Sequence, residues 1–183
     1  MKQRAVFLDR DGVLNRAVIK EGKPYPPASI EEMEIIAGVS EALSALKQAG
    51  YLCIVATNQP DVARGLTSEL QVRQMNDWLK SQLALDAVFT CFHDTKDQCD
   101  CRKPKPGLLI EAAHTYGIDL KRSFMVGDRW RDVEAGNQAG CKTFFIDYGY
   151  SEKQPLSFHY RVASLLEASR IILAQKENIN DSD

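Results

Sequence analysis

The chain lacks any long hydrophobic run. No apolar stretch approaches the roughly 20 residues that a helix needs to cross a bilayer. At the N-terminus, MKQRAVFLDRDG holds only a short apolar stretch that charge interrupts at once, unlike a secretory signal peptide. We therefore expect a protein of the cytoplasm that does not associate with membranes.

An excess of positive charge is also missing. The 23 Lys and Arg residues face 25 Asp and Glu residues, which gives a formal net charge of −2. Recognition of nucleic acid or of an anionic membrane through overall charge needs a cationic excess, and no basic, aromatic-rich stripe is present. We therefore expect a small substrate and no nucleic acid, although a local basic pocket could still bind phosphate.

Internal repeats and low-complexity linkers are absent as well. The 183 residues suit a single compact domain. Hydrophobic residues make up 44% of the chain and charged residues 26%, close to globular averages, which argues against disorder. We expect one domain over residues 1–175 and a polar C-terminal tail over residues 176–183.

Short apolar runs alternate with segments of helical periodicity. Predicted strands are residues 5–8, 51–56, 87–91, 123–128 and 142–147. Predicted helices are residues 38–49, 67–83, 106–116 and 130–139, with a last one from residue 165. In the second helix, Leu70, Met75, Trp78 and Leu79 are expected to face the core. This order favours an α/β fold with a Rossmann-like, doubly wound parallel sheet, and a ligand site at the carboxyl ends of its strands.

Polar residues follow several of the predicted strands. Asp9 and Asp11 come after the first, Thr57 after the second and Asp128 after the fourth. Gly12 allows a sharp turn, so both carboxylates of DRDG could face one small pocket. Asp128 could meet Asp9 across the sheet edge and hold a magnesium ion with it. Such a site suits phosphoryl transfer, which needs an aligned nucleophile and positive charge around the transferred group.

Four motifs that follow one another along the chain support phosphoryl transfer more specifically than a single DxD loop does. DRDGV, ATNQ, CRKPKPG and GDRWRD together resemble the motifs of the haloacid dehalogenase superfamily, over nearly the whole chain. The resemblance implies a magnesium-dependent phosphatase in which Asp9 forms an aspartyl-phosphate and Asp11 acts as general acid and base. Thr57 and Lys103 would bind phosphoryl oxygens. Magnesium would be held by Asp9, Asp128 and the backbone carbonyl of Asp11.

Further charged residues flank these motifs. Arg10 and Arg129 border the acidic loops, where a phosphate contact and a solvated surface charge are equally open interpretations. Arg102 adjoins Lys103, which favours a functional role. Asp132 is expected to support the metal ligands or the helix rather than to bind the metal itself.

A short loop gathers three cysteines and a histidine. The four residues are Cys91, His93, Cys99 and Cys101. Three thiolates and an imidazole form a closed tetrahedral zinc shell, which leaves no position for a reacting water. We therefore expect a structural Zn²⁺ that orients Arg102 and Lys103, the alternative being unrelated thiols beside an unrelated histidine. Cys53 and Cys141 are expected to be buried structural thiols, and His114 and His159 are given no role.

The spacing between motifs leaves no room for a large cap domain. A capless domain with this zinc loop resembles two bacterial groups, the heptose 1,7-bisphosphate 7-phosphatases and the histidinol-phosphate phosphatases. The patterns NQxxxARG and RKPxPG favour the first group, which implies removal of the 7-phosphate in heptose biosynthesis for surface polysaccharide precursors. The chain departs from that group at Pro60, Asp61 and Val62, where SGI is usual, and in the loop GKPYPPAS. The recognised sugar or its anomer is therefore open.

Substrate contacts are expected from Asn58, Arg64 and Arg102, the two arginines at a distal phosphate. A small phosphorylated sugar is the expected partner, and the protein is expected to be a monomer. The alternatives are a phosphatase for histidinol phosphate or another small sugar phosphate, a nucleic-acid 3′-phosphatase, and a non-catalytic zinc-stabilised interaction domain.

Overall fold

A parallel sheet runs through the centre of the computed structural model, which describes residues 2–180. The strands lie in the order β5-β4-β1-β6-β7-β8, and every neighbouring pair is parallel. Their bounds are β1 (Arg4–Leu8), β4 (Tyr51–Asn58), β5 (Ala87–Cys91), β6 (Phe124–Gly127), β7 (Lys142–Ile146) and β8 (Tyr160–Val162). Strands covered on both faces are largely apolar, which is why the central ones appear in the sequence as short hydrophobic runs.

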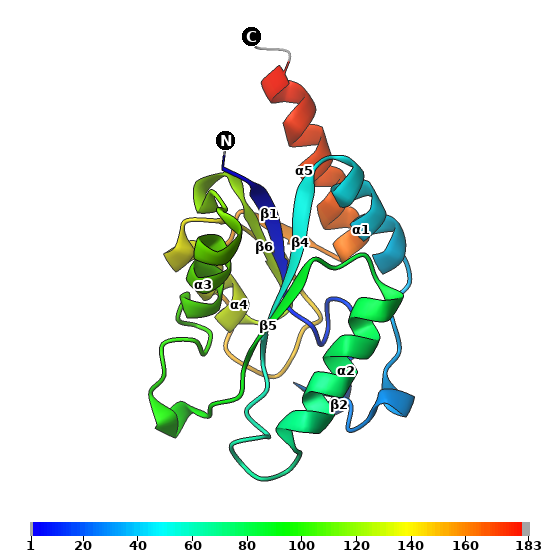
Figure 1. Ribbon diagram of the computed structural model, residues 1–183, viewed down its shortest axis with the longest axis vertical. Coiled ribbons are helices and arrows are strands. Elements are labelled where there is room, and N and C mark those ends of the chain that lie inside the picture. The colour runs from blue at the N-terminus through cyan, green and yellow to red at the C-terminus, as the bar shows by residue number, and fades with distance from the viewer. Residues whose placement is uncertain (1, 181–183) are drawn as a thin grey trace.

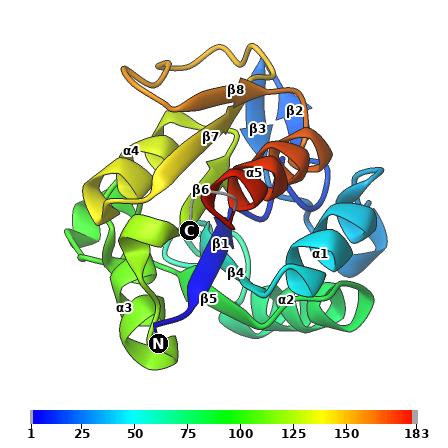
Figure 2. The ribbon, with the colours of Figure 1, turned by 90° about the horizontal axis from the view of Figure 1, so that it is seen from above.

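Helices cover both faces of the sheet. They are α1 (Val39–Gln48), α2 (Glu69–Gln82), α3 (Gly107–Tyr116), α4 (Trp130–Ala139) and α5 (Leu165–Asn180), with 3₁₀ turns η1 (Ile30–Glu32), η2 (Thr95–Asp97) and η3 (Leu120–Arg122). Figures 1 and 2 show α3 and α4 on one side and α1, α2 and α5 on the other. Leu43, Leu79 and Ile172 belong to one apolar cluster, while Leu108 and Met125 belong to another. The predicted doubly wound α/β fold is confirmed.

Local signals placed the helix ends correctly. The hydroxyl of Ser68 accepts a hydrogen bond from the backbone N–H of Gln71 at 3.1 Å, which caps α2; such a cap stabilises a helix by about 1 kcal/mol. Gly117 and Gly140 adopt left-handed φ values of 63° and 83° and end α3 and α4, as predicted.

The structure also corrects the sequence prediction. A hairpin of β2 (Val18–Lys20) and β3 (Lys23–Tyr25) lies where a loop was expected, and the edge strand β8 was not predicted. Strands of three residues carry too little periodicity to be recognised. The prediction that Leu70 faces the core is wrong, because its side chain is 67% exposed and Val72 is buried instead.

The last helix, α5, packs against α1 and extends to Asn180. The predicted polar tail, residues 176–183, therefore begins within this helix, and residues 181–183 lie outside the described residues. Neither α5 nor any other helix within residues 2–180 is long and apolar enough to cross a membrane.

Candidate functional site

Three buried carboxylates meet at the carboxyl ends of the central strands. These strand ends point toward the lower part of Figure 1. Asp9 follows β1, Asp128 follows β6, and Asp132 lies in the first turn of α4. One carboxylate oxygen from each lies within 4.8 Å of the others. The structure thus brings Asp9 and Asp128 together as expected, and it adds Asp132, which the sequence had placed outside the ligand set.

Lys103 supplies positive charge at this cluster. Its ammonium group lies 2.9 Å from an oxygen of Asp9 and 2.6 Å from an oxygen of Asp132, and it also donates to the carbonyl of Ala56 at 2.7 Å. One cation does not balance three buried acids. Burial and then the charge of Asp132 raise the pKa of Asp9 to about 6, and burial and then Asp9 raise the pKa of Asp128 well above its usual value.

The cluster fits a divalent cation. One carboxylate oxygen of Asp128 is buried without any hydrogen-bond partner, a state that is costly unless an ion completes it. Gly12 makes the close packing possible, since its φ is 89° and a side chain there would lie 2.0 Å from the other oxygen of Asp128. An all-oxygen, strongly anionic donor set is the type that Mg²⁺ prefers.

Tyr150 orients the carboxylate of Asp128 through a hydrogen bond. Its hydroxyl donates to the second oxygen of Asp128 at 2.9 Å. Tyr150 lies outside the four motifs and was not predicted as a site residue, although it follows the strand β7 and thus comes to the same edge of the sheet as the carboxylates.

We expect Tyr150→Phe to weaken magnesium binding about tenfold, because groups that orient metal ligands typically contribute at this level. Titration calorimetry of the metal-free protein with Mg²⁺ measures this directly. Tyr116→Phe is the matched control, since the Tyr116 ring packs edge-on against Phe89, away from the carboxylates. Equal affinities for the two variants would show that the hydroxyl of Tyr150 does not position Asp128.

Asp11 is held by a set of side-chain donors. Its carboxylate accepts hydrogen bonds from the guanidinium of Arg10 at 3.0–3.2 Å and from the amides of Asn15 and Gln59, each at 2.9 Å. Arg10 is 1% exposed and also donates to Asn76 at 3.0 Å. Arg10 is therefore a buried positioning residue rather than a solvated surface charge.

The last two residues of β4, Thr57 and Asn58, connect this centre to the loop that carries Lys103. The hydroxyl of Thr57 accepts from the amide of Gln59 at 3.0 Å. The Asn58 amide donates to the carbonyl of Lys103 at 3.0 Å and accepts from its N–H at 3.1 Å. Both polar atoms of Asn58 thus fix the backbone that carries Lys103.

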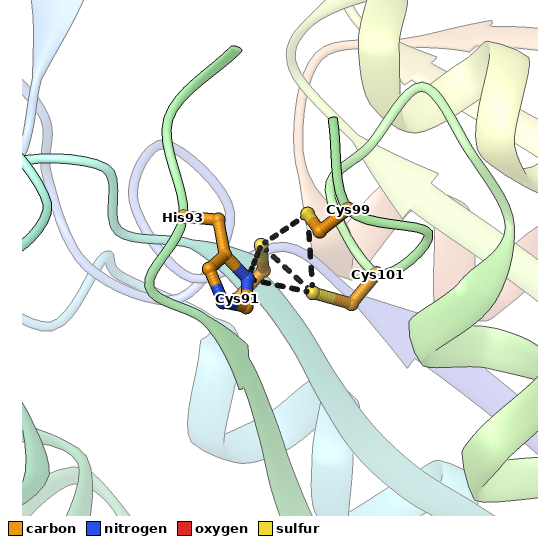
Figure 3. Close-up of side chains that lie close together, drawn as sticks. All are labelled: Cys91, His93, Cys99 and Cys101. Atoms are coloured by element: carbon orange, nitrogen blue, oxygen red, sulfur yellow. Dashed lines mark hydrogen bonds between the residues drawn. The ribbon is translucent and has the colours of Figure 1, made fainter. Parts of the chain in front are cut away.

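The cysteine loop forms a second candidate metal site. Figure 3 shows the side chains converging from the end of β5 and from the loop that precedes Arg102. The sulfur of Cys101 lies 3.0 Å from that of Cys91, 3.4 Å from that of Cys99 and 3.3 Å from the Nδ1 of His93. In a tetrahedron with zinc–sulfur bonds of about 2.3 Å, the sulfurs are about 3.8 Å apart, and the separations here, 3.0–3.7 Å, are close to or somewhat shorter than this. The four donors therefore match the size and chemistry of a zinc site.

Zinc at this position would fix the loop that carries Arg102 and Lys103. Arg102 follows Cys101 directly and donates to the carbonyl of His93 at 3.1 Å, which ties the two segments of the cluster together. Lys103 comes next in the chain. The cluster thus holds the two cationic residues in place without lining the acidic centre.

A cavity of about 410 Å³ opens over the acidic centre. Its acidic lining residues are Asp9, Asp11, Asp61 and Asp132, with Lys103 beside them. Its basic residues are Lys23, Arg64, Arg102, Arg129 and Arg131. Arg129 forms an ion pair with Glu152, and Arg131 has a pKa lowered by burial and then by the charges of Arg129 and Arg102. A buried nucleophile beneath a cationic rim suits a small phosphorylated compound.

Known proteins resemble the chain in sequence and structure. Residues 100–168 match the HAD-hydrolase-like family model. D-glycero-β-D-manno-heptose-1,7-bisphosphate 7-phosphatase of Pasteurella multocida is 38% identical over 95% of this chain and 99% of its own length. The corresponding α-anomer phosphatase of Burkholderia mallei is 38% identical over 80% of each chain. The crystal structure of D,D-heptose 1,7-bisphosphate phosphatase from B. bronchiseptica, complexed with magnesium and phosphate, has a TM-score of 0.77 and 29% identity, covering 94% of this chain and 99% of that one.

Proposed function

Because the chain belongs to the heptose-1,7-bisphosphate 7-phosphatase family of HAD-like hydrolases, we propose that it removes the 7-phosphate of D-glycero-D-manno-heptose 1,7-bisphosphate in heptose biosynthesis. The observation that carries this proposal is the position of Asp9, which contacts Lys103 and opens into the cationic cavity. A carboxylate placed in this way can attack a phosphorus atom whose oxygens the cations receive.

In the proposed mechanism, Asp9 and Asp11 share the chemistry. An oxygen of Asp9 attacks phosphorus and the bond to the sugar oxygen breaks, while Asp11 donates a proton to that oxygen. An aspartyl-phosphate remains on Asp9. Asp11 then takes a proton from water, which attacks phosphorus and releases inorganic phosphate and free Asp9. Arg10 and Gln59 hold the Asp11 carboxylate for both proton transfers.

The other predicted site residues support these steps. Thr57 and Lys103 would bind the oxygens of the transferred phosphoryl group. Asp9, Asp128 and Asp132 would hold Mg²⁺, together with the backbone carbonyl of Asp11. The ion would reduce the repulsion between the anionic nucleophile and the anionic substrate.

For the sugar end, we propose contacts with Asn58, Arg64 and Arg102, all of which line the cavity. Arg64 is already paired with Asp94 through two hydrogen bonds of 2.9 Å, so it would have to share its charge with a ligand. Pro60, within the segment that departs from SGI, also lines the cavity. Since relatives named for either anomer are equally identical to this chain, both anomers belong in the assay.

A substrate panel tests the proposed function. The panel contains both heptose bisphosphate anomers, histidinol phosphate, other sugar phosphates and DNA with a nick bearing a 3′-phosphate. We expect kcat/KM for one of the bisphosphates to exceed that for histidinol phosphate by more than about tenfold, since a site built for a polar group rejects substrates lacking it. A tenfold preference for histidinol phosphate would overturn the substrate, and salt-sensitive binding to the nicked DNA would favour a nucleic-acid 3′-phosphatase.

We further propose a cytoplasmic monomer with one catalytic domain, residues 1–175, followed by the tail of residues 176–183. Neither nucleic acid nor a membrane would be a partner, and the formal net charge of −2 supports this. Light scattering during size-exclusion chromatography tests the oligomeric state, with a mass near the 20.5 kDa of the chain as the expected result.

A further inference from the structure

The arginines around the cavity differ in how their charges are balanced. Arg64 pairs with Asp94 and Asp61, and Arg129 pairs with Glu152. Arg131, by contrast, forms no ion pair with any carboxylate in residues 2–180.

The position of Arg131 makes an unbalanced charge costly. Its side chain is partly buried in the cavity wall, and the guanidinium groups of Arg102 and Arg129 repel it. A partly buried cation among like charges gains stability when an anion binds between them. The carboxylates of Glu152 and Asp132 attract the guanidinium only from beyond ion-pair distance, and each already pairs with another cation, Arg129 and Lys103 respectively. A ligand anion can therefore supply the close counter-charge.

The local structure keeps the guanidinium in place. Arg131 is the second residue of α4, directly before Asp132, and its guanidinium lies 5.1 Å from the centre of the Trp130 ring. The flat Trp130 ring orients the planar guanidinium group of Arg131, which can then donate two parallel hydrogen bonds to a phosphate. Arg131 and Asp9 line the same cavity, so an anion bound at Arg131 would share that cavity with the nucleophile.

From this arrangement we propose that Arg131, together with Arg102, binds the phosphate of the substrate that is not transferred, and so selects bisphosphates over monophosphates. The inference rests on the proposed function and refines it, because it assigns the distal phosphate to Arg131 rather than to the already paired Arg64. A cavity of about 410 Å³ falls within the range of small-molecule sites, roughly 300–1,000 Å³.

The test compares heptose 1,7-bisphosphate with heptose 7-phosphate, which lacks only the distal group. For Arg131→Gln, we expect the ratio of kcat/KM between the two substrates to fall about 10- to 100-fold, mainly through KM, as expected for lost hydrogen bonds to a charged group. Arg131→Lys, which keeps the charge without the fork, should fall between this variant and the wild type. Arg170→Gln, an exposed position on α5, is the charge-matched control and should leave the ratio unchanged.

Two results distinguish a failure of the role proposed for Arg131 from a failure of the proposed function. If the wild type prefers the bisphosphate and Arg131→Gln keeps that preference, or loses activity equally on both substrates, the role of Arg131 is overturned while the function stands. If the wild type hydrolyses p-nitrophenyl phosphate but shows no preference for the bisphosphate, the proposed substrate is overturned and the role of Arg131 with it.

Discussion

Asp9→Asn is expected to lower kcat by about 10⁴-fold or more, because an amide cannot form the phosphorylated intermediate and loss of a nucleophile removes most of the rate enhancement. The variant should still fold. Asparagine keeps the shape of the side chain and an oxygen that can accept from Lys103, now 2.9 Å away. It also removes one of three carboxylates that repel each other, so the melting temperature should not fall.

Steady-state assays with the bisphosphate, together with thermal unfolding and metal analysis, check this prediction. Asp77→Asn is the matched control, since Asp77 is exposed on α2, far along the chain from the acidic centre. It should retain full activity. Wild-type turnover by Asp9→Asn would rule out the proposed nucleophile, whatever the substrate.

Loss of the cysteine cluster should have the second largest effect. We expect Cys101→Ser to abolish zinc binding, because its sulfur lies within 3.0–3.4 Å of the other three donors. Binding of structural zinc contributes strongly to folding. A net loss of about 3 kcal/mol would lower the melting temperature by about 10 °C in a chain of this size. Activity should fall about 10- to 100-fold, since Arg102 and Lys103 lose their anchoring.

Metal analysis by mass spectrometry, thermal unfolding and kinetics measure the three effects. Cys141→Ser is the control, because this buried thiol lies outside the cluster. It should keep one zinc per chain and normal activity. A zinc-free Cys101→Ser variant with full activity would show that the loop does not determine the position of Lys103.

Some features of this protein follow directly from local sequence. The buried strands consist mainly of apolar residues, and residues such as Ser68 and Gly140 mark helix ends through their own hydrogen bonding or backbone freedom. Asp9 and Asp128 were placed together because parallel strands end at one edge of the sheet. These inferences need only the hydrophobic periodicity of each segment and the order of strands and helices along the chain.

Other features depend on contacts that no local pattern records. From the sequence, Asp132 is only a residue in the first turn of a helix. Its place in the acidic centre depends on Lys103, which is distant in sequence and whose ammonium nitrogen lies 2.6 Å from the carboxylate of Asp132. Arg10 carries a full charge in a loop, yet it is buried because Asp11 and Asn76 satisfy it. The hairpin that carries Lys23 was missed because its strands have only three residues each.

The strand order has a consequence for how such an enzyme can change. Asp9 and Asp128 follow β1 and β6, the two central strands, whereas the basic residues of the cavity come from the hairpin, the loop between β4 and α2, the cysteine loop and the start of α4. Substitutions in the rim can therefore alter the accepted sugar without moving the nucleophile. A lineage could exchange one phosphorylated metabolite for another by mutating its periphery, while the reaction itself is inherited unchanged with the centre of the sheet.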